Sequence, residues 1–322
     1  MDLLIPSAQA VVGLVLVLIF AERLVRGVAG LAAGLGLSAF LLSVVFLGFD
    51  PENLAVGAAG AYEGASGLAL GSIVGAAMVA LALAFGITAL IVPMRFERAP
   101  LAVLGVPVAA VLLLAALAWD GELTRSDGLV LLAGYAVTIG YLWWLSRHGI
   151  DIEADSEVAA EAEEAREAGA GRSAVLLLVS LAGVAVGGEL LVLGSSDLIG
   201  RLGLSETVVG MTILALAVSI EELARELPAA LKGRAEISYG NVAGSAVGFF
   251  LLNAGLIALL APLEVDGPTR TFYLPFAIGT VVLVSALLWT RRVGRPAGAI
   301  LVLLYAVFAV GGYVLFGAPA TT

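Results

Sequence analysis

Long apolar segments separated by short polar connections make up almost the whole chain. A bilayer core needs about 20 consecutive apolar residues per helix, and the connections between these segments carry most of the charged residues. The pattern therefore predicts an all-α membrane protein with about ten transmembrane helices. The expected spans are residues 6–26, 36–62, 66–92, 99–118, 127–147, 173–194, 205–231, 237–261, 271–290 and 297–317.

Composition agrees with a membrane protein and excludes several classes of function. Of 322 residues, 61% are hydrophobic and only 13% are charged, against about 25% charged in soluble domains. The mean hydropathy of +1.08 leaves no room for a large water-soluble domain. Cysteine is absent and His148 is the single histidine, which excludes disulfides, thiolate metal sites and nucleophilic catalysis that depends on histidine within the membrane.

The expected partners are the lipid bilayer and inorganic cations. The chain lacks a basic patch with interleaved aromatic residues, so nucleic acid is not expected. No cofactor and no particular oligomeric state are indicated.

The two halves of the chain repeat one another. The segment Gly71-Ser72-Ile73-Val74-Gly75 matches Gly240-Asn241-Val242-Ala243-Gly244 at a separation of 169 positions. Residues 1–147 and 173–322 then form two repeats of about five helices each, joined by an acidic connection at 148–172. Because five is odd, the second repeat is predicted to be inverted relative to the first. Inverted repeats with a binding site at their interface are a common plan of secondary transporters.

Basic residues concentrate in alternate connections. One side collects Arg23, Arg26, Arg95, Arg98, Arg147, Arg166, Arg172, Lys232, Arg234, Arg291, Arg292 and Arg295. The other side collects only Arg125, Arg201 and Arg270. Because cytoplasmic loops carry the excess of basic residues, we expect a multi-pass protein of the plasma membrane with both termini extracellular and the 148–172 connection cytoplasmic.

Ionisable residues inside the predicted spans gather in two matched segments. Residues 48–54 (GFDPENL) align with residues 217–223 (AVSIEEL) at the same separation of 169, and charges within a membrane span are functional candidates because they are costly. Asp50 before Pro51 predicts a helix N-cap and first turn, and Ser219 with Glu222 forms a capping-box pattern. Both segments therefore predict a helix that breaks within the membrane and restarts.

The spacing within these segments predicts a cation site. Asp50 and Asn53 are three residues apart, as are Ser219 and Glu222, so each pair shares one helix face, and the two faces converge across an inverted repeat. Their oxygen atoms, with backbone carbonyl groups freed at the breaks, are ligands of hard cations such as calcium or sodium. The alternative for each segment alone is that these residues only cap helices.

Three further residues are candidates at the edge of this site. Glu52 and Glu221 lie one residue off the ligand face, next to the central site or at a second one. Glu221 and Arg225 have the i,i+4 spacing of a simple ion pair. Ser245 follows Gly244 in the glycine repeat and offers a hydroxyl group.

The two halves resemble the alpha-repeats of the cation/calcium exchanger superfamily. Members of that family show a Gly-Thr-Ser-x-Pro-Glu-Leu segment followed on the next helix by a Gly-Ser-Asn-x-x-Asn segment. The first segment corresponds here to residues 48–54 and 217–223, and the second to residues 75–77 and 244–246. The resemblance implies a secondary cation antiporter that works by alternating access and exchanges calcium for sodium or protons.

The chain departs from the family pattern at several ligand positions. Without gaps, the ion-binding glutamate of the family falls on Asn53 in the first half and on Glu222 in the second. A shifted alignment places Glu52 opposite Glu222 instead, as in the proton-coupled branch. Other expected ligands fall on Ala80 and Phe249, whose side chains cannot coordinate a cation, so sites for several sodium ions are depleted.

Two other functions remain open at this point. Paired acids are used in general acid–base catalysis, so an intramembrane enzyme is one alternative, although no nucleophile or histidine accompanies the acids. A relative that keeps the fold without transporting is the other alternative.

Overall fold

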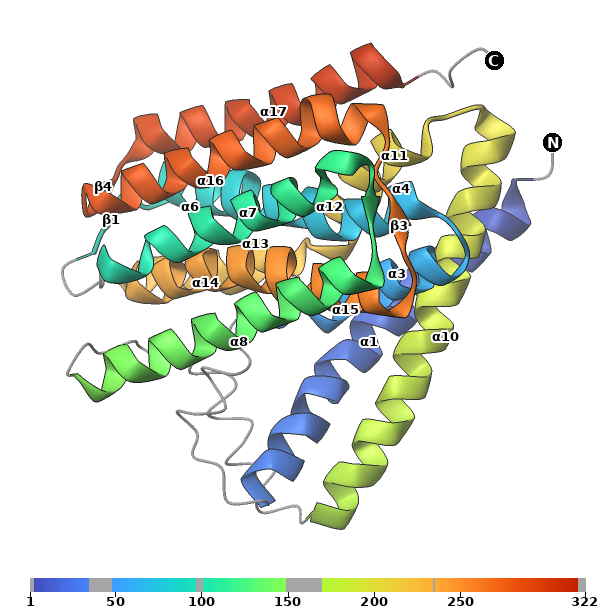
Figure 1. Ribbon diagram of the computed structural model, residues 1–322, viewed down its shortest axis with the longest axis horizontal. Helices are drawn as coiled ribbons and strands as arrows, with labels where there is room; N and C mark the ends of the chain where they lie inside the picture. The colour runs from blue at the N-terminus through green and yellow to red at the C-terminus, as the bar shows by residue number, and fades with distance from the viewer. Residues whose placement is uncertain (1–2, 35–47, 97–100, 149–169, 234, 318–322) are drawn as a thin grey trace.

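The computed structural model describes residues 3–34, 48–96, 101–148, 170–233 and 235–317, and nearly all of them are helical (Figure 1). The helices of the first half are α1 (Leu4–Gly34), α3 (Pro51–Tyr62), α4 (Ser66–Leu70), α5 (Ala76–Met78), α6 (Phe85–Ile91), α7 (Gly105–Leu117) and α8 (Arg125–Arg147). Those of the second half are α10 (Ala170–Leu202), α11 (Glu206–Val209), α12 (Ala215–Val218), α13 (Glu221–Leu231), α14 (Ala235–Val247), α15 (Ala254–Leu260), α16 (Leu274–Trp289) and α17 (Arg295–Phe316).

Short elements of other kinds connect these helices. π-Helical turns continue the α-helices at η1 (Gly71–Gly75), η2 (Val79–Ala84), η5 (Gly210–Leu214), η6 (Gly248–Asn253) and η7 (Thr269–Tyr273). 3₁₀ turns form η3 (Leu101–Val103) and η4 (Ala118–Asp120). The four strands are β1 (Met94–Arg95), β2 (Glu122–Leu123), β3 (Leu263–Glu264) and β4 (Arg292–Val293).

The predicted membrane spans are largely confirmed. Within the described residues, eight helical segments are long and apolar enough to cross a membrane, and the bent pair Glu206–Val218 and Glu221–Leu231 makes a ninth when counted as one span. The predicted span at 36–62 is described only from Gly48 onward, because residues 36–47 lie outside the described part of the chain. Most of the acidic connection, 149–169, also lies outside it.

Two spans form the centre of the bundle. The segments Ser66–Ile91 and Ile237–Leu260 are each 83% buried over their most apolar window, whereas the other eligible single spans are 22% to 39% buried. Small residues let the first of these spans pack closely on η5: a Cβ added at Gly71 would lie 2.2 Å from the backbone carbon of Gly210. These central spans flank the segments that carry the acidic residues.

A long helix pair lies obliquely to the rest of the bundle in Figure 1: α1 and α10, which pack along each other over most of their lengths. Their contact also depends on small residues. A Cβ at Gly13 would lie 2.3 Å from the Leu191 nitrogen, and one at Gly194 would lie 2.6 Å from the Ala10 nitrogen. These contacts show that the two helices run antiparallel.

Contacts between the halves come in exchanged pairs. β1 of the first half pairs with β4 of the second, and β2 of the first half pairs with β3 of the second, both antiparallel. A Cβ at Gly128 would lie 2.8 Å from the Gly255 carbonyl oxygen, and one at Gly298 would lie 2.6 Å from the Gly86 carbonyl oxygen. The π-helical turns η2 and η6 are also 169 positions apart. The sequence repeat is therefore accompanied by a repeat in local structure and packing.

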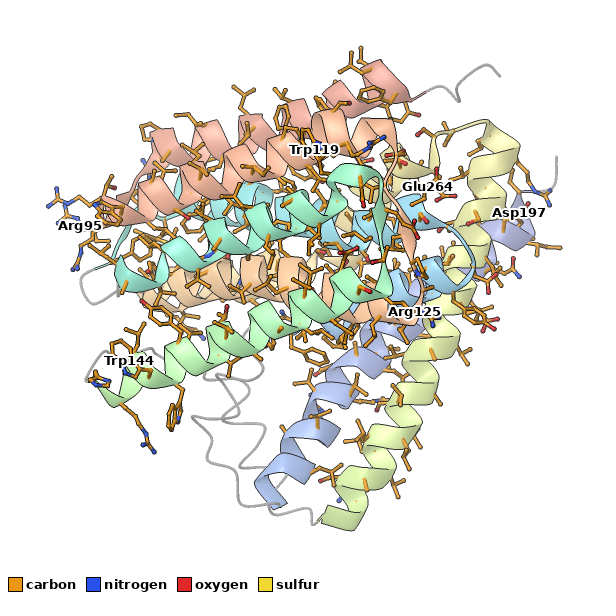
Figure 2. All side chains as sticks on the ribbon, viewed as in Figure 1. Arg95, Trp119, Arg125, Trp144, Asp197 and Glu264 are labelled. Atoms are coloured by element: carbon orange, nitrogen blue, oxygen red, sulfur yellow. The ribbon has the colours of Figure 1, made fainter. Side chains whose placement is uncertain are left out.

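The strands mark two ends of the bundle with different charge. The β1–β4 pair places Arg95 opposite Arg292, and the β2–β3 pair places Glu122 opposite Glu264. Figure 2 shows Arg95 at the same end as Trp144 of α8, with Glu264 toward the other end. The two strand pairs thus place a pair of arginines at one end and a pair of glutamates toward the other.

Candidate functional site

The second half contains the helix break that the sequence predicts. α12 ends at Val218, Ser219 has φ −98° and ψ 17°, and α13 restarts at Glu221 with a bend of 49°. The predicted capping box is wrong, however. Ile220 stands at the N-cap position with no side-chain bond, and Glu222 N donates to the Ser219 carbonyl at 3.2 Å. Because Ile220 is already helical (φ −63°, ψ −25°), the Ser219 hydroxyl is left for a partner in the other half.

In the first half, the described chain resumes at Gly48 and continues into a capped helix, α3. Gly48 has φ +69°, and a Cβ there would lie 1.9 Å from the Gly244 carbonyl oxygen, so both conformation and space require glycine. Asp50 is the N-cap of α3, and its Oδ1 accepts from Asn53 N at 2.8 Å, with Pro51 at the first turn. The predicted cap is confirmed.

Asn53 joins the two breaks. Its Nδ2 donates to Asp50 Oδ2 at 3.0 Å and to Ser219 Oγ at 2.8 Å. Asn253 Nδ2, from η6, donates to the Asp50 carbonyl oxygen at 3.2 Å. Asp50, Asn53 and Ser219 are at most 2% exposed. The structure therefore brings three of the predicted central residues into contact across the repeat.

The carboxyl groups of Asp50, Glu52 and Glu221 form one cluster. Each offers an oxygen atom that lies within 4.8 Å of the other two. Glu52 is 2% exposed, and its Oε2 has no hydrogen-bond partner among the described residues. Glu52 and Glu221 are thus part of the cluster itself rather than residues beside it. Three carboxylates at this separation match the oxygen ligands that hard cations prefer.

Glu222, the fourth predicted central residue, has different surroundings. Its Oε2 accepts from Asn241 Nδ2 at 3.0 Å, and the same nitrogen donates to Glu226 Oε1 at 3.1 Å. Glu222 and Glu226 are each 1% exposed. Sequence reasoning missed Glu226 and Asn241. Their signals were the i,i+4 spacing from Glu222 to Glu226 and a polar residue within the second glycine repeat.

Arg225 connects the two groups of acids. Its NH2 lies 2.6 Å from Glu221 Oε1, which confirms the predicted ion pair, and its NH1 lies 4.0 Å from Glu222 Oε1. The guanidinium group also attracts Asp50 and Glu52 electrostatically. A built-in positive charge therefore partly balances four acidic side chains.

Other predicted positions contribute little to this arrangement. Ser245 is 4% exposed on α14, and among the described residues no hydrogen bond joins it to the acidic groups. Ala80 and Phe249 are fully buried and carry no oxygen in their side chains.

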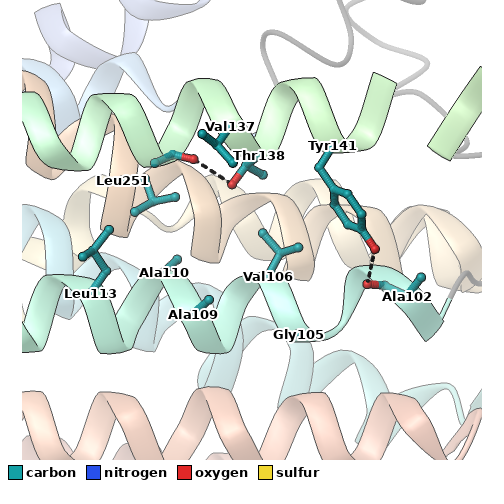
Figure 3. A pocket seen from close by; sticks show the side chains of 11 residues that line it. Ala102, Gly105, Val106, Ala109, Ala110, Leu113, Val137, Thr138, Tyr141 and Leu251 are labelled. Atoms are coloured by element: carbon teal, nitrogen blue, oxygen red, sulfur yellow. Dashed lines mark hydrogen bonds between the residues drawn. The ribbon is translucent and has the colours of Figure 1, made fainter. Parts of the chain in front are cut away.

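A separate cavity of about 450 Å³ lies between α7 and α8 (Figure 3). Its few hydroxyl groups serve the backbone: Thr138 donates to the Gly134 carbonyl at 3.0 Å and Tyr141 to the Ala102 carbonyl at 3.3 Å. The other lining side chains, among them Val106, are apolar. This cavity therefore suits hydrocarbon and is distinct from the acidic cluster.

Comparison with known proteins points to one family. A model of the sodium/calcium exchanger protein family matches residues 7–144 and 172–314. CaxA, a candidate antiporter of Alkalimonas amylolytica, is 29% identical over 94% of this chain and 97% of its own. The inner membrane protein YrbG of Escherichia coli is 28% identical over 96% of both chains.

A solved structure shares the fold. The sodium-calcium exchanger NCX_Mj, soaked with Na⁺ and Sr²⁺, matches with a TM-score of 0.60 at 23% identity, covering 96% of this chain and 98% of the other.

Proposed function

The chain belongs to the sodium/calcium exchanger protein family, and from this premise we propose that it exchanges calcium for sodium or protons by alternating access. Family membership identifies an integral membrane protein that acts as a cation antiporter, and it excludes the intramembrane enzyme left open by the sequence. The finer proposal concerns the ions, the residues that bind them and the arrangement of the helices around them.

The cluster of Asp50, Glu52 and Glu221 carries the proposal. Three carboxyl groups within 4.8 Å of one another are held by two helices that restart beside each other, next to the Asn53–Ser219 hydrogen bond. Burying so much negative charge without a positive partner is costly, and Arg225 offsets only part of it. A hard cation supplies the missing charge, and its ligands are the carboxylate oxygens.

Each predicted ligand has a role in this proposal. Asp50, Glu52 and Glu221 bind the cation directly, with Asn53 and Ser219 holding the two breaks together. Glu222 is the second-repeat acid at the family's ligand position, and it lies against Asn241. Ser245, buried on α14, is a secondary candidate that offers a hydroxyl oxygen.

We also infer two inverted five-helix repeats, residues 1–147 and 173–322, connected through the acidic segment 148–172. The exchanged strand pairs and the exchanged glycine contacts of Gly128 with Gly255 and Gly298 with Gly86 are what a twofold relation between the halves would produce. The repeat predicts ten spans, and the predicted span at 36–62 is described only from Gly48 onward.

The proposed orientation places both termini outside the cell in a plasma membrane, with the arginine-rich end of the bundle in the cytoplasm. The chain has no cysteine, so a single cysteine can be introduced at Glu157. We expect it to be protected from an impermeant thiol reagent in intact cells and labelled after permeabilisation. Labelling in intact cells would reverse the orientation.

The ligand set bears on the choice between sodium and protons as the counter-ion. Ala80 and Phe249 remove oxygen ligands, and Arg225 takes up part of the negative charge, so few positions remain for several sodium ions. Protons compete with calcium for carboxylates, since a carboxyl group coordinates a cation when ionised. We therefore expect calcium affinity to fall as the pH is lowered.

The deciding experiment is flux in reconstituted vesicles with calcium, sodium and proton gradients imposed one at a time. We expect calcium uptake driven by an outward gradient of protons or sodium, and we expect no uptake when neither gradient is present. A protein that folds and reconstitutes but moves none of these ions would be the non-transporting relative.

A further inference from the structure

Glu226 lies one helical turn beyond Glu222, deep in the protein and outside the cluster of Asp50, Glu52 and Glu221. It is 1% exposed, and its Oε1 accepts from Asn241 Nδ2 at 3.1 Å. The same nitrogen donates to Glu222 Oε2 at 3.0 Å. One amide NH₂ group therefore lies between two carboxylate oxygens, a position that suits a positive charge.

Among the described residues, Glu226 has no ion-pair partner, although Arg225 precedes it in α13. Its Oε2 is buried with no hydrogen-bond partner among the described residues. The neighbouring Arg225 attracts Asp50, Glu52, Glu221 and Glu222, and in the described part of the chain no basic side chain forms an ion pair with Glu226. Burying a carboxyl group is energetically unfavourable when one of its oxygen atoms has no hydrogen-bond or cation partner.

The first half lacks this group altogether. At the separation of 169 positions, Glu226 corresponds to Gly57 and Asn241 to Ser72. A Cβ at Gly57 would lie 2.4 Å from Ser72 Oγ and 2.3 Å from a methyl group of Ile257. Both first-half positions are therefore packed together with no acid between them.

The counterpart of Ile257 is Thr88 on α6, a helix that packs against α13. Thr88 is fully buried, and its Oγ1 has no partner among the described residues. Gly57 of the first half packs against Ile257. The matched positions are Glu226 and Thr88, and each has a buried oxygen atom without a hydrogen-bond partner among the described residues.

We propose that Glu226, Glu222 and Asn241 form a second hard-cation site, separate from the cluster of Asp50, Glu52 and Glu221. Rotating the Asn241 amide places its Oδ1 where the NH₂ now lies, which makes the ligand set entirely oxygen, as calcium and sodium require. Thr88 Oγ1 is the further oxygen on the facing helix. The proposal deepens the proposed function, because it adds a site for the same class of ion.

Equilibrium binding tests the second site on purified full-length protein in detergent, with ⁴⁵Ca²⁺ and ²²Na⁺ in separate arms. We expect Glu226→Gln to bind one cation fewer per chain than the unchanged protein in at least one arm, while the remaining affinity stays within about threefold. Glu264→Gln, at an exposed acid of β3, is the matched control and should change neither quantity.

Each other outcome has a definite meaning. Unchanged stoichiometry in both arms overturns the second site, and complete loss of binding by Glu226→Gln shows a single shared site instead. If the unchanged protein binds neither ion, the proposed function itself fails before any variant is compared.

A second variant covers a failure of Glu226→Gln to fold. Asn241→Asp places a third carboxyl group between Glu222 and Glu226, so we expect a lower unfolding temperature than the unchanged protein in buffer free of calcium and sodium. Added Ca²⁺ or Na⁺ should then raise that temperature more than it does in the unchanged protein. Equal or smaller shifts with both ions would contradict a cation at this position.

Discussion

The helices that restart after the two breaks, α3 and α13, occupy matched positions but differ in chemistry. α3 has its polar residues at the start and is then made of small apolar residues (PENLAVGAAGAY). α13 carries charge through two turns (EELARELPAAL). Val56 and Gly57 of the first half are replaced by Arg225 and Glu226 in the second. The first half therefore supplies two acids at the start of α3, Asp50 and Glu52, whereas the second half carries charged side chains through two turns of α13.

The caps show the same division. In the first half the Asp50 carboxylate is held by its own helix, through Asn53 N at 2.8 Å. In the second half the N-cap position of α13 is Ile220, which makes no side-chain cap bond, and the Ser219 hydroxyl accepts from Asn53 across the interface at 2.8 Å. The cap of α3 is thus made within its own half, whereas the Ser219 hydroxyl finds its partner in the other half. Three substitutions test this difference.

The largest effect is expected for Gly48→Ala. Alanine at φ +69° costs about 1–2 kcal/mol, and the added Cβ would also lie 1.9 Å from the Gly244 carbonyl oxygen. We expect little or no monodisperse protein after purification. The matched change at the equivalent position of the second half, Ala217→Gly, should lower the unfolding temperature by only a few degrees. Similar losses from both variants would show that the two breaks are built alike.

Asp50→Asn should leave the fold intact and abolish calcium binding at the cluster of Asp50, Glu52 and Glu221. Asparagine is as good an N-cap as aspartate, so the unfolding temperature should change little, while the cluster loses a carboxylate that lies within 4.8 Å of Glu52 and Glu221. We expect at least a 100-fold loss of calcium affinity in a binding assay. Ser219→Ala, at the matched position, should cost about fivefold, because it removes only an acceptor for Asn53.

The two outcomes distinguish capping from coordination at Asp50. If Asp50→Asn binds calcium as the unchanged protein does, Asp50 serves only as a cap. Asp127→Asn provides a control, since Asp127 accepts from Thr124 N at 2.8 Å near the start of α8, remote in sequence from both breaks.

Most of what the sequence predicts correctly is local. Apolar runs locate the spans because a bilayer requires them. The Asp50–Pro51 pair marks a cap because each residue favours its position by itself. The i,i+4 spacing marks the Glu221–Arg225 pair because both lie within one helix.

What the sequence misses depends on angles between elements. The sequence predicts Glu52 off the ligand face because the three-residue rule holds along one helix, whereas the acidic cluster joins side chains at the starts of α3 and α13, two helices from opposite halves. The Ser219 capping box failed because the hydroxyl found a partner 166 positions away. The sequence shows Asn241 only as part of a glycine repeat, because no neighbouring residue indicates that α14 places it against Glu222 and Glu226.

Among the three main substitutions, the smallest effect is expected for Arg225→Gln, which makes the second half more like the first, where Val56 stands at this position. Removing the guanidinium leaves Glu221 without its partner at 2.6 Å and increases the net negative charge around the cluster. We therefore expect calcium affinity to rise by about tenfold, which corresponds to about 1.4 kcal/mol. Arg201→Gln is the control, because Arg201 forms the same i,i+4 pair with Asp197 at 2.8 Å on α10 and should not alter calcium affinity. If Arg225→Gln instead weakens binding, the guanidinium acts by positioning Glu221 and Glu222, and the difference between the halves is structural rather than electrostatic.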